Sequence, residues 1–402
     1  MKEAITLLIR MGESGRNTVV LLGAGASVDA GLPTTEGLTR CMLDFFASSD
    51  GPYRQFDNAL RFIHHTTEAD RASRGLGGTV DIERLFLVVD QLAERDTTAL
   101  NPFVERWHGS LERFDSPEPP DYALEREAVR VVRGILSPPR GRPAESQVAR
   151  DLVALVRRRG RGDVSGGQHL RGLRDAMLRT VPSLLKVPEH ADLAYLKPLF
   201  GVPARGTLTI ATLNYDVTVE RCAELHAVSL STGMAGWCES GAFAWGDSSV
   251  RLLKLHGSCD WWAPKSQRSE RWSLGVPALE AVPGIIFGEG NKLRARGPFL
   301  TLFMEFTESL RSATDVLVVG YSFRDEHVNA ALLRWANERS GRRLIVVSPT
   351  VSQKGTMGSA QTEPVLSFLR QLDLETNGLF RFQAITTTAR DGITKGVEAA
   401  GS

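Results

Sequence analysis

The feature that most constrains the fold of this chain is a short apolar run that ends in small residues. It reads Val19-Val20-Leu21-Leu22, followed by Gly23-Ala24-Gly25-Ala26-Ser27. A buried strand that leads through small residues into a helix is typical of the first half of a nucleotide-binding βα unit. Side chains at Gly23 or Gly25 would keep the backbone amides away from a phosphate. Because Val28 replaces the third glycine of the usual fingerprint, a plain strand–helix turn stays an alternative for this motif alone.

Length and charge narrow the class of protein. The chain has 402 residues, with 48 basic and 47 acidic side chains and a net charge of +1. This length favours two or three domains, and the charge balance favours neither nucleic acid nor a membrane surface as a partner. No apolar run reaches the roughly 20 residues that span a bilayer. Met1 to Asn17 carries charges and lacks the apolar core of a signal peptide, so we expect a soluble, cytoplasmic protein.

The cysteines are scattered and form no Cys-x-x-Cys pair. They are Cys41, Cys222, Cys238 and Cys259. This spacing indicates neither a disulfide framework nor a zinc ribbon. We therefore predict buried free thiols and no metal site.

Apolar, β-branched runs alternate with helical patterns at the start of the chain and again after residue 205. The predicted strands are 17–22, 207–212, 228–231, 250–255, 284–287, 315–319 and 343–347, and the predicted helices are 36–47, 216–225, 298–312 and 325–339. Near-continuous apolar strands that alternate with helices predict an α/β fold, with a Rossmann-like parallel sheet covered by helices on both faces. Residues 380–387 read as one more edge strand, and 397–402 read as a loose tail.

Between about residues 53 and 200, strand-like runs are rare. Helical periodicity marks 61–65, 81–93, 122–136, 147–158 and 169–185. We therefore predict a Rossmann-like domain made of 1–50 and 201–402, with a large, mostly helical insertion over 51–200. An arginine-rich segment runs from Arg133 to Arg179 without interleaved aromatic residues. We expect it to be solvated rather than to bind nucleic acid directly.

Polar or small residues follow four of the predicted strands. These are Thr212-Leu213-Asn214-Tyr215-Asp216, His256-Gly257-Ser258, Gly320-Tyr321-Ser322 and Ser348-Pro349. Each has an ordinary explanation by itself, such as an Asx turn or a histidine at the end of a core strand. In an open parallel sheet, however, ligands bind at the carboxyl ends of the strands. Together with the glycine turn, the four segments predict a nucleotide crevice.

Four motifs, in their order along the chain, resemble the NAD-binding core of the sirtuin superfamily. They are Gly-Ala-Gly-Ala-Ser, Thr-Leu-Asn-Tyr-Asp, Leu-His-Gly and Gly-Tyr-Ser. The resemblance covers about 15–50 and 205–350. It is strongest to the bacterial sirtuin-like NADase domains of antiphage defence systems, in which Thr-x-Asn-Tyr-Asp and Gly-Tyr-Ser-Phe-x-Asp-x-His are common. The latter motif reads Gly320 to His327 here.

Three departures separate the chain from deacylase sirtuins. The two Cys-x-x-Cys pairs that hold their structural zinc are missing. Pro33-Thr34-Thr35-Glu36 stands in place of their Pro-Asp-Phe-Arg, and Leu213 replaces the glutamine of their Gln-Asn-Ile-Asp. The resemblance therefore implies NAD hydrolysis to nicotinamide and ADP-ribose rather than protein deacylation, with no metal required.

The same resemblance implies roles for single residues. His256 would contact the ribose hydroxyls and act as general base, a role open to histidine because an unperturbed imidazole titrates at about 6.5. Asn214 would orient the nicotinamide ribose or the attacking water, and Asp216 would bind the carboxamide. The amides of 23–27 would hold the diphosphate at a helix N-terminus. The implied NAD-binding residues are Gly23, Ala24, Gly25, Ala26, Ser27, Leu32, Pro33, Thr212, Asn214, Asp216, Gly320, Tyr321, Ser322 and Ser348.

The resemblance also implies partners. It points to a homo-oligomeric effector of abortive infection that works with a separate HerA-like ATPase translocase, or alternatively with a short prokaryotic Argonaute. A protein deacylase and a non-enzymatic NAD-binding assembly subunit stay as alternatives. A Rossmann dehydrogenase is excluded, because the chain is helical where an acidic residue should end a second strand. Five of the seven tryptophans lie around Leu255-His256-Gly257, where we expect either local core packing or a lid or oligomer surface.

Overall fold

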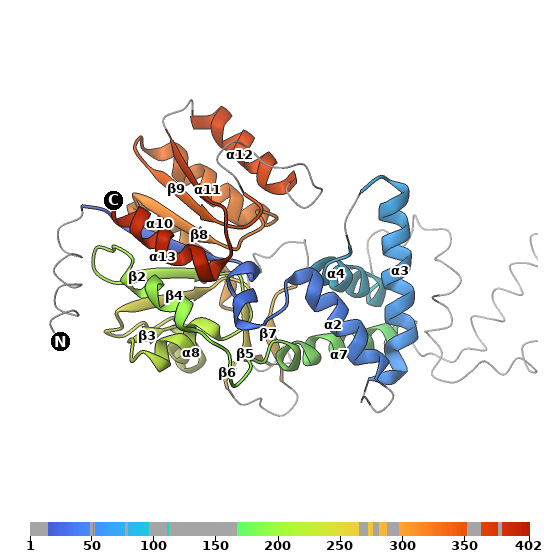
Figure 1. Ribbon diagram of the computed structural model, residues 1–402. Helices are drawn as coiled ribbons and strands as arrows, with labels where there is room; N and C mark the ends of the chain where they lie inside the picture. Colours follow the sequence, from blue (N-terminus) through green and yellow to red (C-terminus); the bar gives the residue numbers. More distant parts are fainter. Residues whose placement is uncertain are drawn as a thin grey trace, which may run out of the picture. The chain divides into compact units, whose positions relative to one another are not determined.

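The computed structural model describes residues 15–48, 51, 53–76, 79–95, 111, 167–264, 272–275, 281–287, 297–351, 363–376 and 380–402. Its larger sheet has seven strands, in the order β10-β9-β8-β1-β2-β4-β3 (Figure 1). Its strands are β1 (Thr18–Leu22), β2 (Leu208–Thr212), β3 (Leu230–Ser231), β4 (Val250–Lys254), β8 (Asp315–Val319), β9 (Arg343–Val347) and β10 (Arg381–Ile385). Every neighbouring pair is parallel, which confirms the predicted α/β class.

Helices bury both faces of this sheet. Along β1, Val19 and Leu21 belong to one apolar core, whereas Val20 and Leu22 belong to the other. The first core includes α10 (Phe299–Ser312), α11 (Glu326–Glu338) and α12 (Glu363–Thr376). The second includes the 3-10 helix η6 (Ala194–Gly201), α8 (Thr218–Leu225) and α13 (Ala389–Gly401). Since neither face meets water, the strands read as continuous apolar runs.

The end of the chain corrects one prediction. Residues 397–402 are not a loose tail, because α13 extends to Gly401 and packs against β8, β9 and η6 (Figure 1). Ile393 and Ala400 are fully buried in it. A Cβ at Gly392 would lie 2.3 Å from Cγ1 of Val347. Glycine therefore weakens the helical signal in the sequence while it lets the helix lie close to the sheet.

The strand predicted at 284–287 lies outside the parallel sheet. It is β7 (Val282–Ile285), which pairs antiparallel with β5 (Gly257–Ala263); β6 (Ser273–Leu274) pairs with the other edge of β5. Trp261 is fully buried, and three neighbouring tryptophans pack against the same core as partly buried residues: Trp237, Trp245 and Trp272. Local core packing therefore accounts for these four side chains.

The chain divides into two compact units. One contains Met1–Phe45, His64–Leu87 and Met177–Ser402; the other contains Phe46–Ile63 and Val88–Ala176. The helices α2 (Thr35–Ala47), α3 (Asp57–Ser73), α4 (Ile82–Ala93) and α7 (Gln168–Leu184) contribute residues to both. The helices predicted at 36–47, 81–93 and 169–185 are thus confirmed, and the one at 61–65 is part of a longer helix. The helices predicted at 122–136 and 147–158 lie outside the described residues, and the insertion over 51–200 stays a prediction.

Two smaller expectations concern charge and thiols. The run Arg157–Arg161 lies outside the described residues, but Arg174 of the same basic segment pairs with Asp90 and Glu94 at 3.2 and 3.1 Å. The prediction of buried thiols holds for Cys222, is wrong for the exposed Cys41, and holds only in part for Cys238 and Cys259, which are half-buried. Within the ranges that the structure describes, no helix is both long and apolar enough to cross a membrane.

Candidate functional site

Strand register brings the predicted site residues to one edge of the sheet. Leu22 at the end of β1 is level with Thr212 of β2 and with Val319 of β8. Thr212 is level with Lys254 of β4, and Val319 with Val347 of β9. The residues that follow these strands therefore lie along a single edge. From β1 the sheet is extended on one side by β2, β4 and β3 and on the other side by β8, β9 and β10. The point at which the strand order reverses is where parallel sheets bind ligands, and it lies on this edge beside β1.

Three glycines join two loops at the switch point. A Cβ at Gly320, whose φ is +63°, would lie 2.3 Å from the backbone nitrogen of Ala26. A Cβ at Gly25 would lie 2.8 Å from Cα of Gly320, and one at Gly23 would lie 2.6 Å from Cα of Tyr321. The amides of Gly23 and Gly25 donate to the carbonyls of Val319 and Gly320, both at 2.9 Å. The glycines are thus required by contact between two backbones, whether or not a phosphate approaches.

The turn after β1 differs from the expected start of an α-helix. It consists of two single-turn 3-10 helices, η1 (Ala24–Ala26) and η2 (Val28–Ala30). The amide of Ala26 donates to Gly23 and that of Ser27 donates to Ala24. Of the five amides predicted to hold a diphosphate, only that of Ala24 has no acceptor among the described residues. An anion bound here would use the Ala24 amide, or the turn would have to open.

Asn214 ties the loop after β2 to the glycine turn. Its Nδ2 donates to the carbonyl of Gly23 at 2.9 Å and to Oγ of Ser27 at 3.1 Å. Its own amide donates to Oγ1 of Thr212 at 3.1 Å, and the residue is buried. These bonds use both hydrogens of the side-chain amide, so Oδ1 is the atom left to accept a hydrogen bond from a ligand.

Asp216 is held on one side only. Its Oδ1 accepts from the amide and the hydroxyl of Thr218 at 3.0 and 2.6 Å, while the described residues supply no donor for Oδ2. Its backbone carbonyl accepts from Nζ of Lys254, a fully buried ammonium that also pairs with Glu220 at 2.7 Å. Burial lowers the pKa of Lys254, but the carboxylates of Glu220 and Asp260 outweigh it and raise the pKa above its usual value. The lysine therefore stays charged and fixes the backbone at Asp216.

His256 has a buried carboxylate partner that the sequence-based site does not include. Its Nε2 lies 2.9 Å from Oδ2 of Asp325. The other oxygen of Asp325 accepts from the amides of His327 and Val328 and so caps α11. With Asp325 ionised, the hydrogen of the shared bond belongs to Nε2, which assigns the lone pair of the imidazole to Nδ1. The helix cap thus positions a carboxylate that sets the tautomer of His256.

The loop that carries Asp325 is tightly held. The amide of Asp325 donates to the hydroxyl of Tyr321 at 3.1 Å, and that hydroxyl donates to Oδ1 of Asn329 at 2.9 Å. Burial raises the pKa of Tyr321 well above its usual range, so the phenol is neutral. Phe323 has a positive φ of 56°, a conformation that the buried ring packing on Tyr321 and Phe368 stabilises.

The site residues form two groups. The first contains Gly23, Ser27, Asn214 and Asp216; the second contains His256, Tyr321 and Asp325. Tyr215 is adjacent to both: it stands between Asn214 and Asp216 in the chain, and its ring centroid is 6.4 Å from that of His256. A small hollow next to the second group is lined by Leu255, His256, Phe299, Phe303, Asp325, His327 and Val328.

Other predicted residues lie apart from both groups. Ser348 bonds Thr350 through its hydroxyl at 3.0 Å. Leu32 is buried in the apolar core beside Leu22, so its side chain contributes packing. Ser322 is exposed and Pro33 is half-buried. Among the described residues, the side chains of these four make no hydrogen bond with the two groups, although the backbone amide of Leu32 donates to the carbonyl of Ser27 at 3.3 Å.

Comparison with known proteins gives a partial family match and several distantly similar structures. No curated protein matches the chain. Among solved structures, a Sir2 homologue in complex with NAD is 12% identical, with 98% of this chain and 93% of that chain covered and a TM-score of 0.36. A mutant Sir2 homologue with ADP-ribose is 11% identical, with 98% and 95% covered and a TM-score of 0.34. A complex of Sir2 with p53 peptide and NAD+ is 13% identical, with 100% and 98% covered and a TM-score of 0.32. Residues 208–364, less than half of the chain but including Asn214, His256 and Asp325, match the family model of the SIR2-like domain.

Proposed function

We propose that this protein is an NAD glycohydrolase, which transfers water to the nicotinamide ribose and releases nicotinamide and ADP-ribose. The observation that carries the proposal is the buried hydrogen bond of 2.9 Å between His256 and Asp325, at the switch-point edge of the parallel sheet. The SIR2-like match over 208–364 supports NAD as the ligand, since the resembling family binds NAD at this edge.

The bond to nicotinamide breaks through an oxocarbenium-like transition state. The pyridinium nitrogen takes the electron pair and leaves as neutral nicotinamide, so no strong acid is needed. Asp216 would accept from the carboxamide through Oδ2, because Oδ1 is already bound to Thr218. Asn214 would accept from a ribose hydroxyl or from the attacking water through Oδ1. These contacts align the sugar and stabilise the charge that develops on it.

His256 would remove the proton. Its Nδ1 accepts a proton from the attacking water or from a ribose hydroxyl. The carboxylate of Asp325, hydrogen-bonded to Nε2–H, then offsets the positive charge of the imidazolium. The proton then passes to solvent as ADP-ribose is released. Water as the acceptor fits the departures from deacylases at Leu213 and at the missing cysteine pairs.

The biological setting is a further part of the proposal. The resemblance to antiphage NADase domains supports a cytoplasmic, homo-oligomeric effector that kills an infected cell by depleting NAD. It also supports restraint by a separate partner, a HerA-like ATPase translocase or, alternatively, a short prokaryotic Argonaute.

The experiment is nicotinamide release from NAD by the purified chain without any acylated peptide. Wild type is compared with His256→Ala and with a control, His190→Ala, which removes an exposed histidine far from the strand ends in sequence. We expect release by wild type and by the control, and loss in His256→Ala. Release that depends on an acylated peptide would mean a deacylase instead. NAD binding without release, even with the ATPase partner and DNA present, would mean a non-enzymatic NAD-binding subunit.

A further inference from the structure

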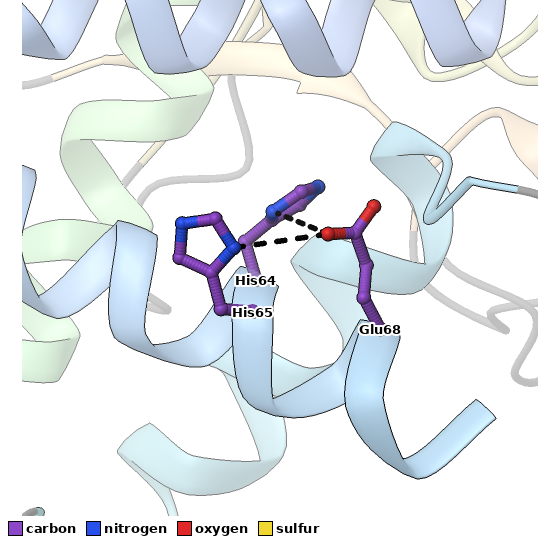
Figure 2. A group of neighbouring side chains, drawn as sticks. All are labelled: His64, His65 and Glu68. Carbon is purple, nitrogen blue, oxygen red and sulfur yellow. Dashed lines mark ion pairs between the residues drawn. The ribbon is translucent and has the colours of Figure 1, made fainter. Parts of the chain in front are cut away.

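A second group of chemically active side chains lies on α3, outside both groups of the nucleotide site. Figure 2 shows His64, His65 and Glu68 with both imidazole rings directed at the glutamate carboxylate. One donor atom from each residue lies within 4.8 Å of the other two. Helix geometry explains the grouping, because each residue turns the helix by about 100°. Glu68 therefore lies one turn beyond the two histidines, at an angle between them.

The distances are those of ligands around a metal ion. Nδ1 of His64 and Nδ1 of His65 lie 3.5 and 3.8 Å from the same oxygen of Glu68. A charge-assisted hydrogen bond would be shorter, at about 2.7–2.9 Å. Two ligands at about 2.1 Å from a tetrahedral zinc ion are separated by about 3.4 Å. Two of the three separations are thus close to those of ligands around an ion, and the third, between the two imidazole nitrogens, is within 4.8 Å.

Burial and ligand type favour a transition metal. The side chain of His64 is 10% exposed, that of Glu68 is 35% exposed and that of His65 is 70% exposed. The site therefore has a buried floor and an open rim, where water can complete the coordination. Two neutral imidazoles and one carboxylate suit Zn²⁺ and similar divalent ions, and do not suit the all-oxygen preference of Mg²⁺ or Ca²⁺.

We propose that His64, His65 and Glu68 form a binding site for a divalent transition metal of the zinc class. The ion would cross-link two successive turns of α3 where packing is poorest, since the structure describes no buried residue from His65 to Arg74. Binding to the native helix stabilises it by mass action. The proposal is independent of NAD hydrolysis, because none of the three residues belongs to the nucleotide site.

The test is a Co²⁺ titration of the metal-free full chain, followed by competition with Zn²⁺. Wild type is compared with His65→Ala and Glu68→Gln, and His190→Ala is the matched control, because it removes an exposed histidine that has a glutamate neighbour in sequence. We expect a single equivalent to give the visible d–d bands of tetrahedral Co²⁺, and Zn²⁺ to abolish them. Both site variants should weaken binding by about tenfold or more, and the control should not. Zn²⁺ should also raise the melting temperature of wild type more than that of Glu68→Gln.

Three results would overturn the proposal. One is the absence of saturable Co²⁺ binding by wild type. Another is sulfur-to-cobalt charge transfer, which would assign the ion to a cysteine such as Cys41. The third is binding that is equal in wild type and both site variants. Circular dichroism distinguishes a loss of binding from misfolding. Both substitutions introduce residues that favour helices, alanine and glutamine.

Discussion

At the scale of single residues, Asp325 links the fold to the proposed chemistry. One carboxylate oxygen caps α11 through the amides of His327 and Val328, and the other holds His256. Asparagine is an equally good helix cap. Its side-chain amide, however, can donate to Nε2 of His256 and would move the hydrogen of the ring to Nδ1, where the base must be free.

The substitution Asp325→Asn should therefore lower the rate of nicotinamide release by roughly 10²- to 10⁴-fold, with a melting temperature close to that of wild type. Asp325→Ala should be equally slow and should also lose about 1 kcal/mol of stability with the cap. Steady-state rates and thermal unfolding of the two variants separate the roles. Full activity of Asp325→Asn would contradict the assignment of His256 as a base set by this carboxylate.

Gly320 is the residue at which the backbone contact between the two loops is closest. Gly320→Ala adds a Cβ that would lie 2.3 Å from the nitrogen of Ala26, at a φ of +63°. Gly341→Ala is the matched control, because its φ is +79° and nothing lies within 4 Å of the added atom. Both variants bear the left-handed strain of about 1–2 kcal/mol, and overlap should cost Gly320→Ala about 1–3 kcal/mol more. Urea unfolding measures the difference, and equal losses would show that the loops separate easily.

The candidate site could be predicted in part from the sequence. His256, Asn214 and Asp216 follow apolar runs, and parallel strands bring such residues to one edge without further information. Asp325 was missed because an aspartate before an amphipathic helix is fully explained as a cap. The division of the site into two groups depends on side-chain hydrogen bonds across the sheet, such as that between Asn214 and Gly23, which no local pattern encodes.

At the scale of elements, the sequence predicts what is strongly periodic and misses what is short or glycine-rich. Strands such as 315–319 and 343–347 are correct to the residue, since burial on both faces makes them continuous apolar runs. The pairing of β5 with β6 and β7 was not predicted, because strands as short as Ser273–Leu274 carry no pattern. Helix α13 was missed because its glycines lower helix propensity.

Helix α13 should nevertheless be essential for stability. Ile393→Ala removes a fully buried side chain from the core that α13 forms with β8 and β9, and should cost about 2–5 kcal/mol of unfolding free energy. Lys395→Ala, on the exposed side of the same helix, should change it by less than about 0.5 kcal/mol. Chemical denaturation compares them. A mild loss for Ile393→Ala would mean that the end of the chain detaches before the sheet unfolds.

At the scale of the whole molecule, two cores share one sheet, so the layers should unfold together. Cysteines report on this cooperativity, because the thiolate is the reactive form and burial suppresses it. Cys41 is exposed on α2, whereas Cys222 is fully buried among residues of η6 and α8. Burial raises the pKa of Cys222 to about 11 and that of Cys259, in β5, to about 12.

Alkylation of the native protein with iodoacetamide at mildly alkaline pH should therefore modify Cys41 rapidly and leave Cys222 and Cys259 largely unmodified. Cys222 and Cys259 belong to different elements, so in a cooperative unit their slow labelling should accelerate together as denaturant is added, at the midpoint seen by circular dichroism. Peptide mass mapping at each denaturant concentration identifies which thiol has reacted. Labelling of Cys259 well below the concentration that exposes Cys222 would contradict a single cooperative unit, because it would mean that β5 and its partners open while the parallel sheet stays folded.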